Sequence, residues 1–180
     1  MKVISVKCKP YVKRFLEMEY GKPLQQGNNQ VVVKLSEGSA IGAFFLCLLQ
    51  KKSERYDKRY SRYKLEKFSQ SVEIRVSDSH FYRYGWELSF TNTVKFGRFV
   101  EDQVKNFMRE DVARKTIFFN LKDAILQFQK EYGFCEEVWP YESIRKHIDR
   151  TGRFRNQTQN FKTTCLKLYN NIDIKQVKLC

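Results

Sequence analysis

The sequence has little histidine and no paired cysteines. Its 180 residues include only two histidines, His80 and His147, and neither has cysteine or carboxylate neighbours at the spacing of metal ligands. The five cysteines are scattered singly, without a C-x-x-C pair, and their odd number leaves one unpaired in any full disulfide scheme. We therefore expect no metal site and no disulfide framework, with reduced thiols in a reducing compartment. Because Cys47 lies within an apolar run, we expect it to be buried as a small hydrophobic residue.

The sequence also lacks the motifs of common enzymes. Its eight glycines form neither a G-x-G-x-x-G nor a Walker-type phosphate loop, and no G-x-S-x-G is present. The EIR segment at 73–75 differs from the E-x-K arrangement of metal-dependent nucleases, because Arg replaces Lys and no Pro-Asp pair precedes it. The EGS segment at 37–39, at an expected helix start, is a candidate anion site. We therefore expect a protein that is not an enzyme and uses no cofactor.

Long apolar runs are absent as well. The longest, residues 40–49 with one glycine inside, is too short to span a bilayer, which takes about 20 residues. Lysines interrupt every apolar run of the N-terminal segment MKVISVKCKPYVKR, so it has no signal-peptide core. We expect a soluble, cytoplasmic protein with no membrane partner.

What the sequence does contain is aromatic residues and unevenly distributed positive charge. With 42% hydrophobic residues, 15 Phe and 10 Tyr, most of the chain is expected to fold. The formal net charge of +14 divides into an excess of +4 over 1–50, +5 over 51–76 and +7 over 143–180, whereas 77–142 has −2. Such segregated charge is typical of a protein that meets a polyanion on particular faces.

The first 76 residues are predicted to form a small α/β domain. Apolar residues alternate over 3–9 and 71–76, as in half-buried strands, and the β-branched run at 31–35 is typical of a buried strand. Apolar spacing after Pro10 predicts a helix over 11–20. A second helix is expected to begin at Ser36 or Ser39, to cover the apolar residues 40–49 and to continue through the basic residues that follow.

Residues 77–180 are predicted to form a second, mainly helical domain, which makes the chain α+β. Asp78 is expected to cap a short helix that ends at Gly85, and Thr91 or Asn92 to cap a long amphipathic helix that runs to about residue 114. A β-like patch, two helices and a C-terminal hairpin follow, with expected bounds of 116–119, 121–132, 141–151 and 161–179.

From residue 92 onward, the order long helix, short strand, helix, turn, helix and hairpin resembles the winged helix-turn-helix family. In that family the last helix enters the major groove and the hairpin forms a wing beside the phosphates. The resemblance implies that 141–151 is a recognition helix with outward donors, followed by residues that contact phosphates and bases. The alternative is a basic helical face that only meets water. The implied DNA-binding residues are Ser143, Arg145, Lys146, His147, Arg150, Arg153, Arg155, Asn156, Gln157, Lys162 and Lys167.

A second basic segment, RYDKRYSRYK at residues 55–64, interleaves tyrosines with Arg and Lys. In one interpretation Arg55, Arg59 and Arg62 neutralise phosphates while the tyrosines stack on bases, as in proteins that bind single strands. In the other, the tyrosines form the packing stripe of an amphipathic helix and the charges face water.

Two segments, RYGWELSFTNTVKFGRFVE and FQKEYGFCEEVWPYESIRKHIDR, resemble uncharacterised proteins of phages and mobile elements in gut bacteria. This resemblance implies no reaction, but it favours a DNA-related role. The leading hypothesis is a non-enzymatic protein that binds double-stranded DNA rather than RNA, as a regulator or accessory factor of a phage or mobile element. The alternative is a structural or scaffolding protein whose basic faces meet acidic partners or packaged nucleic acid without sequence preference.

Overall fold

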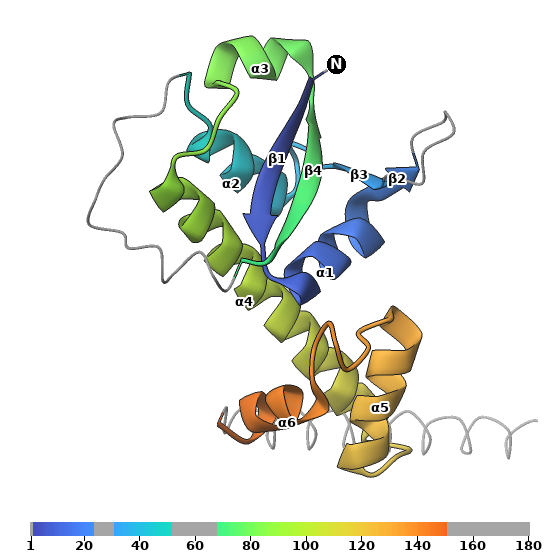
Figure 1. The fold of residues 1–180 in the computed structure, drawn as a ribbon. Coiled ribbons are helices and arrows are strands. Elements are labelled where there is room, and N and C mark those ends of the chain that lie inside the picture. The colour runs from blue at the N-terminus through green and yellow to red at the C-terminus, as the bar shows by residue number, and fades with distance from the viewer. Residues whose placement is uncertain (1, 24–30, 52–67, 151–180) are drawn as a thin grey trace, which may run out of the picture. The chain divides into compact units, whose positions relative to one another are not determined.

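The computed structural model describes residues 2–23, 31–51 and 68–150 of an α+β chain (Figure 1). Within these ranges four strands belong to the N-terminal part, and the elements from residue 77 to residue 150 are helices. The chain divides into two compact units, Met1–Val104 and Lys105–Cys180. The first unit thus extends beyond residue 76, where we predicted a domain boundary. None of the described helices has the length and apolar character needed to cross a membrane.

The first unit contains a four-stranded sheet with the order β1-β4-β3-β2. β1 (Lys2–Cys8) pairs antiparallel with β4 (Gln70–Val76), and Figure 1 shows the two side by side. β3 (Val31–Lys34) pairs parallel with β4 and antiparallel with β2 (Gly21–Pro23). The predicted alternation of β1 and β4 is confirmed, because their inward residues, Ile4, Val6, Cys8, Val72, Ile74 and Val76, are all buried.

β2 was not predicted, because three residues, one of them proline, are too few to show alternation. Gly21 both ends α1 (Pro10–Tyr20) and begins β2, and its N–H donates to the Glu17 carbonyl. A Cβ at Gly21 would lie 2.1 Å from the Glu17 carbonyl oxygen, so only glycine fits there without a backbone shift. This close approach is what turns the chain directly from helix into strand.

α2 (Ala40–Leu48) begins where the sequence predicts, since the Ser39 hydroxyl accepts from an N–H of its first turn. The prediction that this helix continues through the basic residues is wrong. Leu49 has extended backbone, with φ −66° and ψ 147°, and the Gln50 N–H donates to the Glu87 carbonyl at 3.0 Å. A pairing with a segment so distant in sequence ends the helix, and local helix propensity gives no sign of it.

Cys47 is exposed on α2, which corrects the prediction that it is buried. The buried face of this helix carries Ile41, Phe45 and Leu48. Cys47 follows the exposed Ala43 by four residues, so the two lie together on another face. Because the helix is apolar on every side, its composition did not indicate which side packs.

Two predicted helix caps are also corrected. Ser77, rather than Asp78, caps α3 (Asp78–Tyr84), because its hydroxyl accepts from the His80 N–H at 3.2 Å. α4 (Phe90–Lys115) begins before Thr91, and the Ser89 hydroxyl accepts from the Asn92 N–H at 3.2 Å. The Asn92 amide instead donates to the carbonyl of Leu48, at 2.8 Å, where it satisfies an acceptor at the end of α2.

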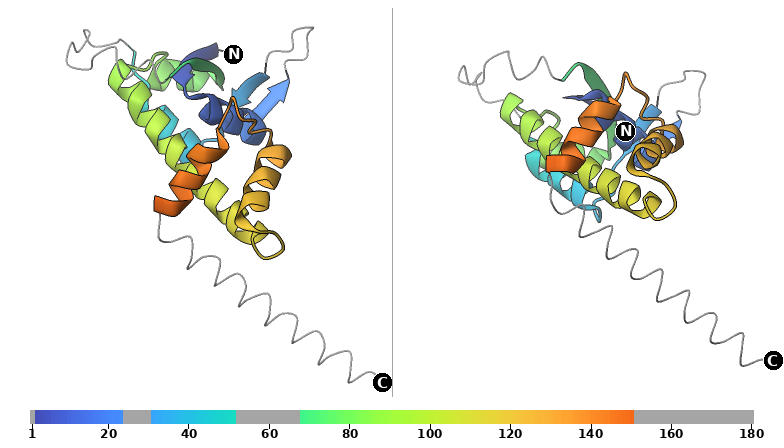
Figure 2. Two further views of the ribbon diagram at one scale, coloured as in Figure 1. Left: turned by 60° about the horizontal axis from the view of Figure 1, so that its bottom comes forward. Right: turned by 90° about the horizontal axis from the view of Figure 1, so that it is seen from below.

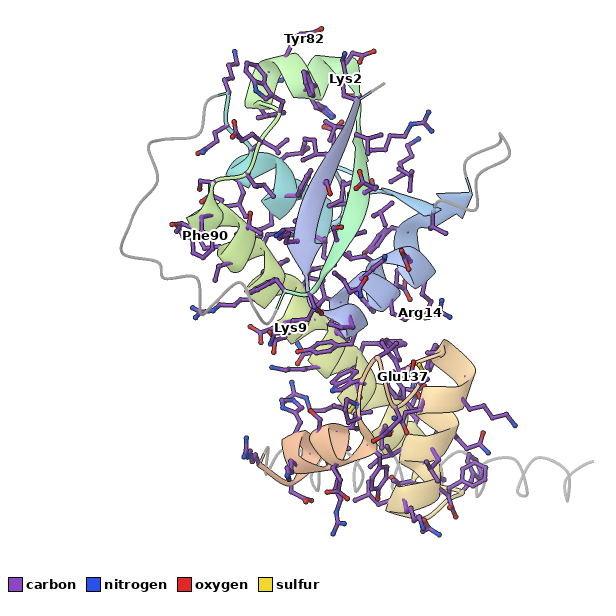
Figure 3. The ribbon with its side chains drawn as sticks, in the orientation of Figure 1. Lys2, Lys9, Arg14, Tyr82, Phe90 and Glu137 are labelled. Carbon is purple, nitrogen blue, oxygen red and sulfur yellow. The ribbon has the colours of Figure 1, made fainter. Side chains whose placement is uncertain are left out.

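Side chains join the helices of the first unit to one another. The ring centroids of Phe45 and Phe96 are 5.2 Å apart, which packs α2 against the first half of α4. Lys9, labelled in Figure 3, follows β1, and its Nζ lies 2.7 Å from Glu101 Oε2 of α4. Phe96 and Val100 are fully buried, as the predicted amphipathic pattern of this helix requires.

The second unit contains the end of α4, α5 (Leu121–Tyr132) and α6 (Tyr141–Arg150), which Figure 2 shows in yellow to orange. The predicted bounds of α5 are confirmed: Asn120 Oδ1 accepts from the Asp123 N–H at 2.9 Å, and Gly133 ends the helix with a φ of 67°. The predicted hairpin at 161–179 lies outside the described residues.

The β-like patch predicted at 116–119 is a turn. The N–H groups of Ile117 and Phe118 donate to the carbonyls of Arg114 and Lys115, at 3.2 and 3.1 Å. β-branched and aromatic residues favour strands in general, but here the last carbonyls of α4 accept their N–H groups. Phe118 is left 81% exposed at this turn.

Candidate nucleic-acid interface

The segment between α5 and α6 is held by one buried amide and one carboxylate. Gln129, buried on α5, donates from Nε2 to the Trp139 carbonyl at 2.8 Å. Glu136 Oε2 accepts from the Tyr141 N–H at 2.9 Å, which satisfies a donor in the first turn of α6 and adds a negative charge there. These two bonds fix where α6 begins relative to α5.

An aromatic cluster fills the space beneath this segment. Phe134 stacks on Phe128 with ring centroids 5.2 Å apart and an interplanar angle of 11°, and Trp139 meets both rings edge-on. Phe128 and Phe134 are fully buried. The predicted inward residues of α6, Ile144 and Ile148, are buried too, so α6 is anchored by one face and presents the other to solvent.

The exposed face of α6 carries two stripes of different charge. Ser143, Lys146 and Arg150 are exposed and recur at the i, i+3, i+7 spacing of one stripe. Among the described residues, no carboxylate lies within ion-pair distance of Lys146 or Arg150. This set, called here the basic stripe, contains three of the five DNA-binding residues that the sequence predicted on this helix.

Arg145 lies on the other stripe. It is exposed, but its Nη1 lies 3.9 Å from Glu142 Oε1 and its Nε lies 3.9 Å from Asp149 Oδ2. Exposed ion pairs of this length contribute little to stability. The two carboxylates nevertheless repel a phosphate that approaches the same guanidinium. His147 is only half-buried rather than outward-facing, which corrects its assignment to the exposed face.

The remaining predicted contacts lie outside the described residues. They are Arg153, Arg155, Asn156, Gln157, Lys162 and Lys167 after α6, and Arg55, Arg59 and Arg62 in the second basic segment.

Most of the net positive charge, +9 of +14, belongs to the same two segments. Residues 52–67 carry seven Lys/Arg against three Asp/Glu, and residues 151–180 carry six against one. The described part of the second unit is close to neutral, with nine against eight over residues 105–150. The basic stripe is therefore a local feature of α6 and not part of a uniformly basic surface.

An ionic cluster around the buried Asp111, near the start of the 116–119 turn, was not predicted. The carboxylate of Asp111, 5% exposed, accepts from Tyr132 Oη at 3.1 Å and from Lys115 Nζ, and Lys115 Nζ also lies 2.8 Å from Glu131 Oε2. Burial, followed by the Asp111 carboxylate, raises the pKa of Tyr132 above its ordinary value. The i, i+4 spacing of Asp111 and Lys115 is the sequence signal for one of these pairs. The cluster ties α4 to α5, and its residues belong to these two helices.

In the described ranges, no group of three or more His, Cys, Asp or Glu side chains is placed to hold a metal ion. Comparisons with family models, curated proteins and solved structures find no match for this chain.

Proposed function

We propose that this chain is a non-enzymatic protein that binds double-stranded DNA, and that the basic stripe of α6 is part of its DNA-contacting surface. The observation that carries the proposal is the stripe itself: two exposed cations, without a described carboxylate partner, on a helix whose opposite face is buried. The sequence continues from Arg150 to Arg153 and Arg155, so positive charge extends past the end of the helix.

The dimensions of α6 suit a groove. An α-helix with its side chains is about 10–12 Å across, and the major groove of B-DNA is about 12 Å wide. Phosphate contacts from Lys and Arg supply most non-specific affinity, whereas base contacts require donors on the face that enters the groove. Ser143, Lys146 and Arg150 offer donors on one line, of which the hydroxyl of Ser143 is the one left for a base edge when the two cations contact phosphates. The winged-helix arrangement stays a proposal: the short strand expected at 116–119 is a turn, and the hairpin expected at 161–179 lies outside the described residues.

The two stripes assign different roles to the cations of α6. Lys146 and Arg150 are the phosphate-contacting residues of the proposal, because nothing acidic among the described residues competes for them. Arg145 is held between Glu142 and Asp149, so its contribution to DNA affinity is expected to be smaller.

The test measures how affinity depends on salt. Duplex binding by the full chain is followed by fluorescence anisotropy from 50 to 200 mM salt, for the wild type and for Lys146→Gln combined with Arg150→Gln. Each phosphate contact contributes about −0.9 to the slope of log K against log salt, so the double variant should be less steep by about 1.8. Lys122→Gln, an exposed cation of α5 in the same unit, is the matched control and should leave the slope unchanged.

A slope equal to that of the wild type in the double variant would remove α6 from the interface. If about six contacts form in total, the wild type should lose roughly 10³-fold in affinity over this salt range, and a flat response would remove DNA binding itself.

The structural alternative is separated by competition. A sequence-selective binder retains a selected duplex against excess random DNA, whereas a structural protein that binds without preference loses it. The concentration of charge in residues 52–67 and 151–180 favours a large non-specific component in either case.

A further inference from the structure

A cavity of about 720 Å³ opens in the first unit at the ends of β3 and β4. These two strands are the parallel pair of the described sheet, and each is followed by a helix, α2 after β3 and α3 after β4 (Figure 1). The sheet is mixed, but at this parallel pair both strands end at the same edge, as in parallel sheets, whose ligands bind in the crevice beyond the carboxyl ends of the strands. The volume lies within the range of about 300–1,000 Å³ that is typical of small-molecule sites.

Two cations meet at the rim of this cavity. Lys34 and Arg75 are partners in the β3–β4 register, so their Cα atoms are neighbours at the strand ends, and both residues line the cavity. Both are exposed, and no carboxylate in the described part of the chain lies within ion-pair distance of either. A guanidinium with a fixed fork beside a compact ammonium is a pair suited to a phosphate group.

Hydroxyl groups add donors around the same opening. Ser36, Ser77 and Ser79 line the cavity, and the hydroxyls of Ser77 and Ser79 are 3.0 Å apart. The carboxylate in the lining is that of Glu37, whose Oε1 lies 2.7 Å from His80 Nε2. This contact gives Glu37 a partner of its own and links the segment after β3 to α3.

The inner wall of the cavity is apolar. It is formed by Phe45 and Leu46 of α2, with Leu35 and Val76 from the strand ends, and by Gly42, which has no side chain. A Cβ at Gly42 would lie 1.9 Å from the Ser36 carbonyl oxygen, so this part of the wall is backbone packed on backbone. A site with cations and hydroxyls at the rim and apolar groups inside matches a ligand with a phosphate at one end and an apolar ring at the other.

We propose that this cavity binds a phosphomonoester with an apolar or aromatic body, of the nucleoside monophosphate class, with Lys34 and Arg75 holding the phosphate. The inference is independent of DNA binding by α6, because its residues belong to the first unit.

The experiment is isothermal titration of the full chain with adenosine 5′-monophosphate, adenosine and inorganic phosphate. The monophosphate should bind one to one, and adenosine, which lacks the phosphate, should not. Arg75→Gln and Lys34→Gln should each raise the dissociation constant about tenfold, since a hydrogen bond to a charged group contributes about that factor. Lys7→Gln removes an exposed cation of β1 outside the cavity and should leave binding unchanged.

Circular dichroism melts confirm that each variant is folded; all three changes are at exposed positions. Absence of monophosphate binding at millimolar concentration would overturn the proposal, as would wild-type affinity in the Lys34→Gln, Arg75→Gln double variant. If Lys7→Gln weakened monophosphate binding as much as the cavity variants, the binding would reflect general attraction to a basic protein. That result would also overturn the proposal.

A 5′-phosphorylated oligonucleotide and its 5′-hydroxyl form identify the source of the phosphate. Binding of the phosphorylated form that depends on Arg75 supports the site and extends the ligand to nucleic-acid ends. Binding of the mononucleotide alone supports the site with a free small molecule as its ligand.

Discussion

Replacing Phe128 with alanine should lower the free energy of unfolding of the second unit by about 3–5 kcal/mol. Phe128 is fully buried, and its ring lies 5.2 Å from Phe134, 5.3 Å from Tyr132, 6.0 Å from Phe107 and 6.3 Å from Trp139 by centroid. Truncation removes the transfer free energy of the ring and leaves a cavity with rigid aromatic walls, which relax little. The value is therefore expected toward the upper end of the range.

The assay is urea unfolding followed by tryptophan fluorescence. The chain has two tryptophans, so Trp86→Phe leaves Trp139, in the affected cluster, as the single reporter. With a slope of about 2 kcal/mol per molar urea, a loss of about 4 kcal/mol lowers the midpoint by about 2 M. Phe118→Ala is the matched control, since the same atoms are removed from a side chain that is 81% exposed, and its effect should stay within about 0.5 kcal/mol. Equal shifts for the two variants would refute the packing argument.

Two further predictions concern titratable side chains. Burial raises the pKa of the Cys8 thiol to about 12, so alkylation of the folded chain at pH 8 with peptide mass mapping should label Cys47 and Cys135 and spare Cys8; labelling of all three at one rate would contradict this. A hydrogen bond from Lys115 lowers the pKa of Glu131, so its stabilising effect is present above the unfolded-state pKa and is lost as the pH falls through the lowered folded value. Lys115→Gln should return the Glu131 pKa toward its ordinary value by carbon-13 NMR, and an unchanged titration would rule out Lys115 as the cause.

Periodicity predicted the core well because burial of a strand or helix face repeats with a fixed spacing. The inward residues of β1, β4, α5 and α6 were found in this way, and Asn120 and Gly133 marked both ends of α5. Failures occurred where a distant residue decides the local structure. Gln50, predicted to be helical, pairs with Glu87 instead. The Asn92 side chain, predicted to cap the start of α4, caps the end of α2.

The candidate sites show the same limit. The spacing of apolar residues in α6 predicts which of its cations are exposed. It does not distinguish Arg145, which contacts Glu142 and Asp149, from Lys146, because these contacts depend on side-chain conformation. The rim of the cavity could not be predicted at all, because Lys34 and Arg75 are 41 positions apart and become neighbours only through the parallel pairing of β3 with β4. No local pattern contains that information.

The pairing of β1 with β4 has a consequence for the chain during its synthesis. Ile4 and Ile74 are partners, yet the residues between β1 and β4 must be made before the two strands can meet. At about 5–20 residues per second, the ribosome takes several seconds to do so. Throughout that interval the first strand lacks its partner in the sheet, and its backbone groups stay open to other chains. For those seconds the first strand is therefore a segment on which a chaperone or another chain can act.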